Sequence, residues 1–355
     1  MSTAEQQALA ESVRGLVSAV EPGSVATPDA SWAEGLLAAE LHGIGIPEHR
    51  GGVGGDLADA LVVVSTLAAA AVSWPGTANA LVVDALLSGW SDAEADVGDV
   101  PVVPALGAAL PRLTAGDGGW TLDGTVRAVS CARDAVRLAV LACDIDGRPR
   151  VALVPASAAT VDAGENLAGE PRDDLRLDGS LPEDAVSPPL DPSLPAAARG
   201  LTALVTAAAI TGALEQVLAV TLGYVRDREQ FGSRLADFQA VQQHLAEVAE
   251  QVAAARAALT VATRAGDPAS YGAAKARTSD AAGIVARLAH QLHGAMGTSL
   301  EYPLGHLTKR LWSWTQEAGV ARDWHRELGR ELLDGPRDLW MAVIEQAPPV
   351  ELPST

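Results

Sequence analysis

Apolar residues recur at every third or fourth position through the first part of the chain. This spacing predicts amphipathic helices, because one face of a helix returns about every 3.6 residues. Proline or glycine stands at the ends of several of these runs, where it favours a stop or a start. The predicted helices cover residues 3–22, 32–42, 56–72 and 76–87, within an N-terminal helical domain assigned to residues 1–98.

A different pattern follows, with short apolar runs separated by turn residues. The segment Gly119–Gly124 is typical of a strand followed by an Asp-Gly turn, and Leu138–Cys143 and Val151–Val154 are bounded by Asp-Gly or proline. These runs predict a small β domain, assigned to residues 99–194 and closed by a proline-rich linker.

Helical spacing then returns and continues almost to the end of the chain. The runs predict long helices joined by short turns, which is typical of an antiparallel helix bundle. We assign this bundle, a C-terminal four-helix bundle, to residues 195–347 and expect a frayed tail from Pro348. The predicted fold class is therefore α+β, mostly α, with predicted bundle helices over residues 196–227, 237–265, 268–296, 304–318 and 320–334.

Composition indicates which residues build the core, and net charge indicates which classes of partner are unfavourable. Apolar residues make up 48% of the chain but aromatic residues only 4%, so Ala, Val and Leu must build the core, which favours closely packed helices. The formal net charge is −20, which argues against nucleic acid and anionic membranes as partners. The N-terminus lacks the basic start of a secretory signal, and the apolar stretch Leu57–Val72 is too short to span a bilayer. A cytoplasmic location is expected.

The densest charge in the second half lies in residues 226–242. A helix end is followed by a Phe231-Gly232 break and a new helix predicted to begin near Asp237. Arg228 and its neighbouring arginines would then lie beside free backbone N–H groups, an arrangement that suits an anion. The glycine-rich segment 43–55 lacks the P-loop and GxGxxG patterns, so a tight connection is its better interpretation.

Three segments, in this order, resemble the acyl-CoA dehydrogenase family. Residues 41–54 resemble its LGxxGxPExxGGxG segment, and residues 224–247 resemble its YxxxRxQFGxxLxxFQxxQxxLAxM signature. Residues 291–303 are similar to its QxxGGxGxxxEYP segment. The predicted order of helical domain, small β domain and helix bundle is also the layout of that family.

The resemblance implies an FAD enzyme fold that forms tetramers as a dimer of dimers, with each flavin straddling two subunits. In the family, the Arg of RxQFG and the QxxGGxG loop reach the pyrophosphate and adenosine end of the neighbouring subunit's FAD. The residue types agree, because Arg offers a fork of donors to a diphosphate and Gly lets backbone approach a ligand. The implied cofactor-binding residues here are Arg228, Phe231, Gln239, Gln291, Gly294 and Gly297.

The resemblance also implies a catalytic Glu that removes the α-proton of an acyl-CoA while the β-hydrogen passes to flavin. One family position for this base falls on Ala318, and the other falls on Thr202. Glu317 stands one residue early, and one residue turns a helical side chain by about 100°. Glu317 is therefore expected to face elsewhere, and no catalytic residue is assigned.

The predicted β domain shows matching losses. The family's TEPxxGSD loop has no counterpart near Val100–Leu113, and Ala128 stands where its GxKxWIT segment places a flavin-flanking Trp. Elements that serve a neighbour's FAD are thus present, whereas elements that serve the subunit's own flavin and substrate are missing.

This partition suggests the non-catalytic subunit of an α2β2 heterotetramer, with a homologous catalytic partner that holds the acyl-CoA. Electron-transfer flavoprotein is the expected acceptor. Similar heterotetramers in actinobacterial steroid-CoA breakdown suggest that substrate class by family analogy alone.

Two alternatives remain open. One is a self-sufficient homotetrameric dehydrogenase with Glu317 as base, and the other is a flavin-free assembly or binding module. Arg228 and the glycines of the 291–297 segment argue against the second. No metal site is expected, because the histidines of the bundle lack ligand spacing and Asp144–Gly147 is better interpreted as a hairpin turn than as a calcium loop.

Overall fold

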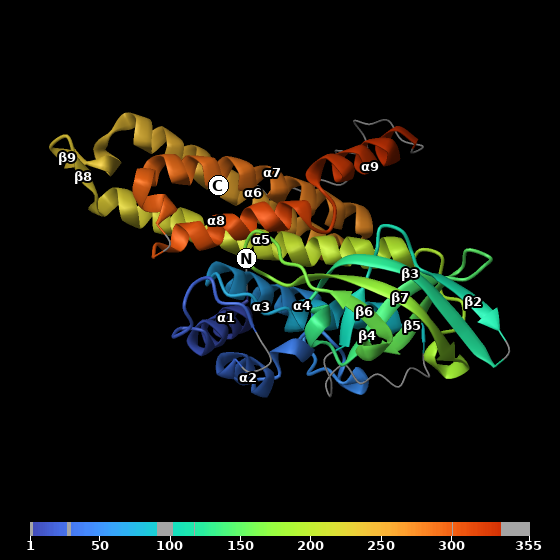
Figure 1. The fold of residues 1–355 in the computed structure, drawn as a ribbon. Coiled ribbons are helices and arrows are strands. Elements are labelled where there is room, and N and C mark those ends of the chain that lie inside the picture. Colours follow the sequence, from blue (N-terminus) through green and yellow to red (C-terminus); the bar gives the residue numbers. More distant parts are fainter. Residues whose placement is uncertain (1–2, 27–29, 91–101, 117, 300, 335–355) are drawn as a thin grey trace.

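The computed structural model describes residues 3–26, 30–90, 102–116, 118–299 and 301–334. It confirms the predicted mostly helical α+β class (Figure 1). The predicted boundary between residues 98 and 99, residues 335–347 of the predicted bundle domain and the tail from Pro348 lie outside the described residues.

Among the described residues, four α-helices precede the sheet: α1 (Ala4–Leu16), α2 (Ser31–Ala38), α3 (Leu57–Ala69) and α4 (Gly76–Leu87). The start of α3 follows from local chemistry, because Asp56 and Asp59 each accept the other's backbone N–H in a capping box. The first two predicted helices were too long. Helix α1 ends at Leu16 instead of residue 22, and α2 ends at Ala38 before a 3-10 turn at Leu41–Gly43.

Seven strands of the described chain form one mixed sheet in the order β1-β4-β2-β3-β7-β6, with β5 paired to β4. Strand β4 runs parallel to β1 and β2, and the other pairs are antiparallel. The predicted strand at Leu138–Cys143 and the hairpin turn at Asp144–Gly147 are both confirmed, since Asp144 accepts the N–H groups of Asp146 and Arg148. The strands are β1 (Val102–Ala105), β2 (Arg112–Gly116), β3 (Gly119–Ser130), β4 (Arg137–Cys143), β5 (Pro149–Pro155), β6 (Ala159–Asp162) and β7 (Arg172–Pro182).

The predicted turn after Gly119–Gly124 was wrong. Strand β3 runs on to Ser130 and pairs with β7 along most of its length. Gly124 lies within the strand with φ +147°, where a side chain would come within 2.9 Å of Pro111. The glycine therefore permits close strand packing, not a chain reversal.

The second half forms helices α5 (Leu194–Asp227), α6 (Gln239–Ala265), α7 (Pro268–His293), α8 (Pro303–Gln316) and α9 (Ala321–Asp334). Helix α5 is central and packs against α3, α6, α7 and α8. A side chain at Gly212 would come within 2.0 Å of the Ser65 carbonyl oxygen, so small residues on α5 are what let α3 approach it. Helix α5 is also the one described helix long and apolar enough to cross a membrane, and this packing accounts for its apolar character.

Candidate functional site

A short hairpin ends the bundle on the side away from the sheet (Figure 1). Strand β8 (Glu229–Gln230) pairs with β9 (Ser233–Arg234), and Phe231 and Gly232 form the turn with φ +54° and +79°. Two positive φ angles are typical of a primed two-residue turn, which explains the Phe-Gly pair. The Phe231 side chain is 92% exposed. Helix α6 begins at Gln239, two residues later than predicted, because a 3-10 turn at Leu235–Asp237 precedes it.

Arg228 caps the C-terminal end of α5. Its backbone N–H donates to the Tyr224 carbonyl at 2.9 Å, and its own carbonyl accepts the Leu235 N–H at 2.9 Å. The side chain is exposed, and its guanidinium has no hydrogen-bond or ion-pair partner among the described residues. An unpaired guanidinium on a fixed backbone suits binding of an anion.

The C-terminal end of α7 carries the second group of predicted residues. Gln291 is exposed in the last turn, and Gly294 follows the helix with φ +57° and ψ −137°. No atom lies within 4 Å of a side chain placed at Gly294, so its backbone is open to a ligand. Gly297 differs, because a side chain there would come within about 3.2 Å of His290, His293 and Leu304. Packing of the turn accounts for that glycine.

The antiparallel helices bring all six predicted residues to one end of the bundle. Tyr224 near the end of α5 stacks on His293 at the end of α7, with ring centroids 4.4 Å apart. A shallow groove of about 490 Å³ lies beside them and is lined by Tyr224, Asp227, Arg228 and Tyr302, among others. We call the six residues the predicted cofactor face: Arg228, Phe231, Gln239, Gln291, Gly294 and Gly297.

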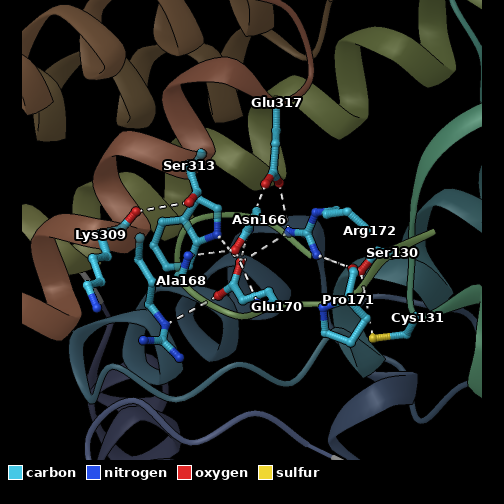
Figure 2. Close-up of polar contacts among 12 residues, drawn as sticks. Ser130, Cys131, Asn166, Ala168, Glu170, Pro171, Arg172, Lys309, Ser313 and Glu317 are labelled. Carbon is cyan, nitrogen blue, oxygen red and sulfur yellow. Dashed lines mark hydrogen bonds and ion pairs between the residues drawn. The ribbon is translucent and has the colours of Figure 1, made fainter. Parts of the chain in front are cut away.

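The second candidate region lies between the sheet and the end of α8 (Figure 2). Arg172, at the start of β7, donates to the Glu317 carboxylate at 2.7 Å and to the Ser130 hydroxyl at 3.5 Å. Asn166 donates to the other Glu317 oxygen at 2.9 Å. The acid nearest to the family's base position is therefore held in an ion pair.

Beneath this ion pair lies Glu170, a carboxylate that is only 1% exposed. It accepts hydrogen bonds from the Trp314 indole at 2.9 Å and from Asn166 at 2.8 Å, and it pairs with Arg172 at 3.2 Å. It also pairs at 3.3 Å with Arg310, which is equally buried. We call this set the Glu170 cluster: Asn166, Glu170, Arg172, Arg310, Trp314 and Glu317. Sequence reasoning missed all of it except Glu317, because no motif marks it.

Ala318 and Thr202, the two family positions for a catalytic base, make structural contacts in this fold. Ala318 has φ +52°, and its carbonyl accepts the Trp324 indole N–H at 3.0 Å. The Thr202 hydroxyl donates to the Ala198 carbonyl one turn earlier on α5, at 2.8 Å. Ala128, where the flavin-flanking Trp was expected, lies in a bulge of β3 with its N–H donating to Asp174.

No metal site is found within the described ranges, since no group of three or more His, Cys, Asp or Glu side chains could hold an ion. Burial raises the pKa of the Cys131 thiol to about 11, which keeps it protonated and unreactive at neutral pH. The exposed Arg228 guanidinium and the open Gly294 backbone instead favour anion binding at this end of the bundle.

Comparisons with known proteins agree on one family. The model of the acyl-CoA dehydrogenase C-terminal domain matches residues 199–320. Acyl-CoA dehydrogenase IpdE2 of Mycobacterium tuberculosis is 29% identical over 94% of this chain and 98% of its own length. The fold is similar to a chain of the ChsE4-ChsE5 complex of Mycobacterium tuberculosis, with a TM-score of 0.85, 24% identity and coverage of 95% and 99% of the two chains. It is also similar to a chain of the Tcur3481-Tcur3483 steroid ACAD G363A variant, with a TM-score of 0.79, 24% identity and coverage of 93% and 98%.

Proposed function

Because the chain belongs to the acyl-CoA dehydrogenase family, we propose that it is the non-catalytic subunit of a heteromeric, FAD-dependent acyl-CoA dehydrogenase. A homologous catalytic subunit supplies the base and holds most of the acyl-CoA, in an α2β2 assembly. The proposal includes electron-transfer flavoprotein as electron acceptor and a cytoplasmic location.

The observation that carries the proposal is the ion pair between Arg172 and Glu317. A base must have a carboxylate free to take a proton from the substrate carbon. Glu317 instead accepts from Arg172 and Asn166 at 2.7 and 2.9 Å, and Ala318 and Thr202 offer no carboxylate. This disfavours the alternative of a self-sufficient enzyme with Glu317 as base.

Arg172 also occupies the space between Ser130 and Glu317. A flavin ring needs van der Waals clearance of about 3.5 Å on each face. A single guanidinium contacts Ser130 at 3.5 Å and Glu317 at 2.7 Å, which leaves no such gap between these residues. The space between Ser130 and Glu317 is therefore an unfavourable place for a flavin.

The predicted cofactor face fits the diphosphate end of a partner's FAD. Arg228 would hold the diphosphate, because its guanidinium is exposed and unpaired within the described chain. Gly294 would admit the ligand close to its open backbone, and Gln239 and Gln291 would donate to polar atoms of the adenosine end. Bound FAD supplies the hydride acceptor. The exposed Phe231 would cover the ligand from the hairpin.

The descriptions of two similar structures support a heteromeric assembly and a steroid substrate class. One similar structure is described as a ChsE4-ChsE5 complex and the other as a Tcur3481-Tcur3483 steroid ACAD, so each name pairs two different chains. We propose a steroid side-chain CoA as the substrate class on that basis.

The test is co-expression with the catalytic partner and measurement of FAD bound to the purified complex. Arg228→Ala should lower FAD occupancy severely, because a bound diphosphate would lose its paired charge. Arg264→Ala is the matched control, since Arg264 is an exposed arginine at the opposite end of α6. Full FAD occupancy in Arg228→Ala would contradict the assigned face. FAD bound one per subunit by this chain alone, with turnover, would contradict the whole proposal.

A further inference from the structure

An aromatic cluster, with one buried ring and two half-buried rings, lies beside the predicted cofactor face. His293 is only 3% exposed, and its ring stacks on Tyr224 with an interplanar angle of 24°. Tyr302 lies against the same imidazole, with ring centroids 5.2 Å apart. We call these three residues the His293 cluster. The cluster joins the end of α5, the end of α7 and the residue that precedes α8.

Hydrogen bonds define the tautomer and the orientation of the His293 imidazole. His293 Nδ1 lies 2.8 Å from the Ala289 carbonyl, which can only accept, so Nδ1 carries the proton. Nε2 of the neutral ring then accepts from the Tyr302 hydroxyl at 3.2 Å. Burial lowers the pKa of His293, the Ala289 carbonyl opposes that shift, and nearby His290 adds to it. The ring is therefore neutral and held in one orientation at neutral pH.

The cluster connects the two halves of the predicted cofactor face. Tyr224 lies one helical turn before Arg228, and its hydroxyl donates to the His293 carbonyl at 3.3 Å. His293 immediately precedes Gly294, where the chain leaves α7. Tyr224 and His293 thus link the open Gly294 backbone to the backbone of Arg228.

We infer that His293 is a positioning residue for cofactor binding: its contacts with Tyr224 and Tyr302 hold Arg228 and Gly294 at the spacing that one diphosphate requires. This inference rests on the proposed function, because it concerns the same face. His293 itself is buried. It acts through the backbone of the next residue and through the helix that carries Arg228.

The experiment compares three substitutions in the complex with its catalytic partner. Tyr224→Phe removes only the hydroxyl that bonds to the His293 carbonyl, and His293→Phe keeps a stacked ring but removes both ring hydrogen bonds. Val285→Ala is the structural control, because Val285 is fully buried on the same helix but lies more than two turns before His293 and Gly294. FAD is titrated into the flavin-free complex and binding is followed by flavin fluorescence.

Loss of a hydrogen bond of ordinary strength should weaken FAD binding roughly 2- to 10-fold in Tyr224→Phe. His293→Phe should weaken it at least as much, and Val285→Ala should leave it unchanged although it lowers stability. Amide exchange at residues 294–298, measured without FAD, should become faster in Tyr224→Phe and not in Val285→Ala. This second readout does not depend on activity.

The outcomes separate the two proposals. If Tyr224→Phe and His293→Phe bind FAD like the wild type while Arg228→Ala does not, His293 has no positioning role and the proposed function stands. If Arg228→Ala also binds normally, the assigned cofactor face, on which this inference rests, fails. If Val285→Ala weakens FAD binding as much as the cluster variants, the effect is general destabilisation and the inference is overturned. Should His293→Phe fail to fold, Tyr224→Phe decides the question.

Discussion

The Glu170–Arg310 ion pair predicts an unequal response to removal of its two partners. Both side chains are 1% exposed, and their charged atoms lie 3.3 Å apart. Glu170 has a second cation, Arg172, at 3.2 Å, whereas Arg310 has no second acid within ion-pair distance in the described chain. Its remaining contacts are the carbonyls of Ser24 and His306.

Glu170→Gln should therefore cost more than Arg310→Met. The Glu170 substitution leaves a fully buried cation without a counter-charge, which costs about 3–5 kcal/mol in free energy of unfolding. Arg310→Met leaves Glu170 paired with Arg172, so a loss of about 1–3 kcal/mol is expected. The double substitution removes the stranded cation and should be more stable than Glu170→Gln alone.

Equilibrium urea unfolding of the protein in its native assembly, followed by tryptophan fluorescence, measures these differences through the shift in midpoint. The order of stability should be wild type, Arg310→Met, the double variant and then Glu170→Gln, with the middle two close together. A larger loss in Arg310→Met than in Glu170→Gln would refute the reasoning. Strict additivity in the double variant would refute it as well, because the pair would then not interact.

Three further predictions follow from single contacts. Burial lowers the pKa of Lys275 to about 8, so between pH 8 and its unfolded value near 10.5 the unfolded chain holds more protons and stability rises with pH. Stability of the wild type relative to Lys275→Met, measured by urea unfolding, should rise by roughly 1 kcal/mol from pH 7 to pH 9, and a fall would contradict the assignment. Glu317→Gln should leave turnover of the complex nearly unchanged in steady-state kinetics, whereas a loss of several orders of magnitude would identify it as the base. Gly272→Ala should destabilise by about 1–3 kcal/mol, because the new methyl would lie 2.3 Å from the Trp324 ring. Gly283→Ala on the same helix meets no atom within 4 Å and should instead be neutral or stabilising, so a similar thermal midpoint for the two variants would contradict the packing argument.

Sequence patterns predicted most long elements because their ends carry local signals. Gly266 and Pro268 mark the turn between α6 and α7, and the structure ends α6 at Ala265 and begins α7 at Pro268. The Asp123-Gly124 pair carried an equally clear turn signal, but the predicted turn was wrong. Strand β3 continues through this pair, because it pairs there with a strand more than fifty residues away in sequence. Local patterns report local preference, and strand pairing overrides it.

The sequence by itself determined the class of the fold and the absence of an acid at Ala318 and Thr202, and it predicted the residues of the cofactor face. These follow from residue identity, spacing and motif resemblance. Tertiary structure alone decided that Glu317 is bound to Arg172, which lies 145 positions away, and that Tyr224 reaches the His293 carbonyl across 69 positions. Both contacts depend on how the sheet and helix ends pack against one another, and no local periodicity encodes that packing.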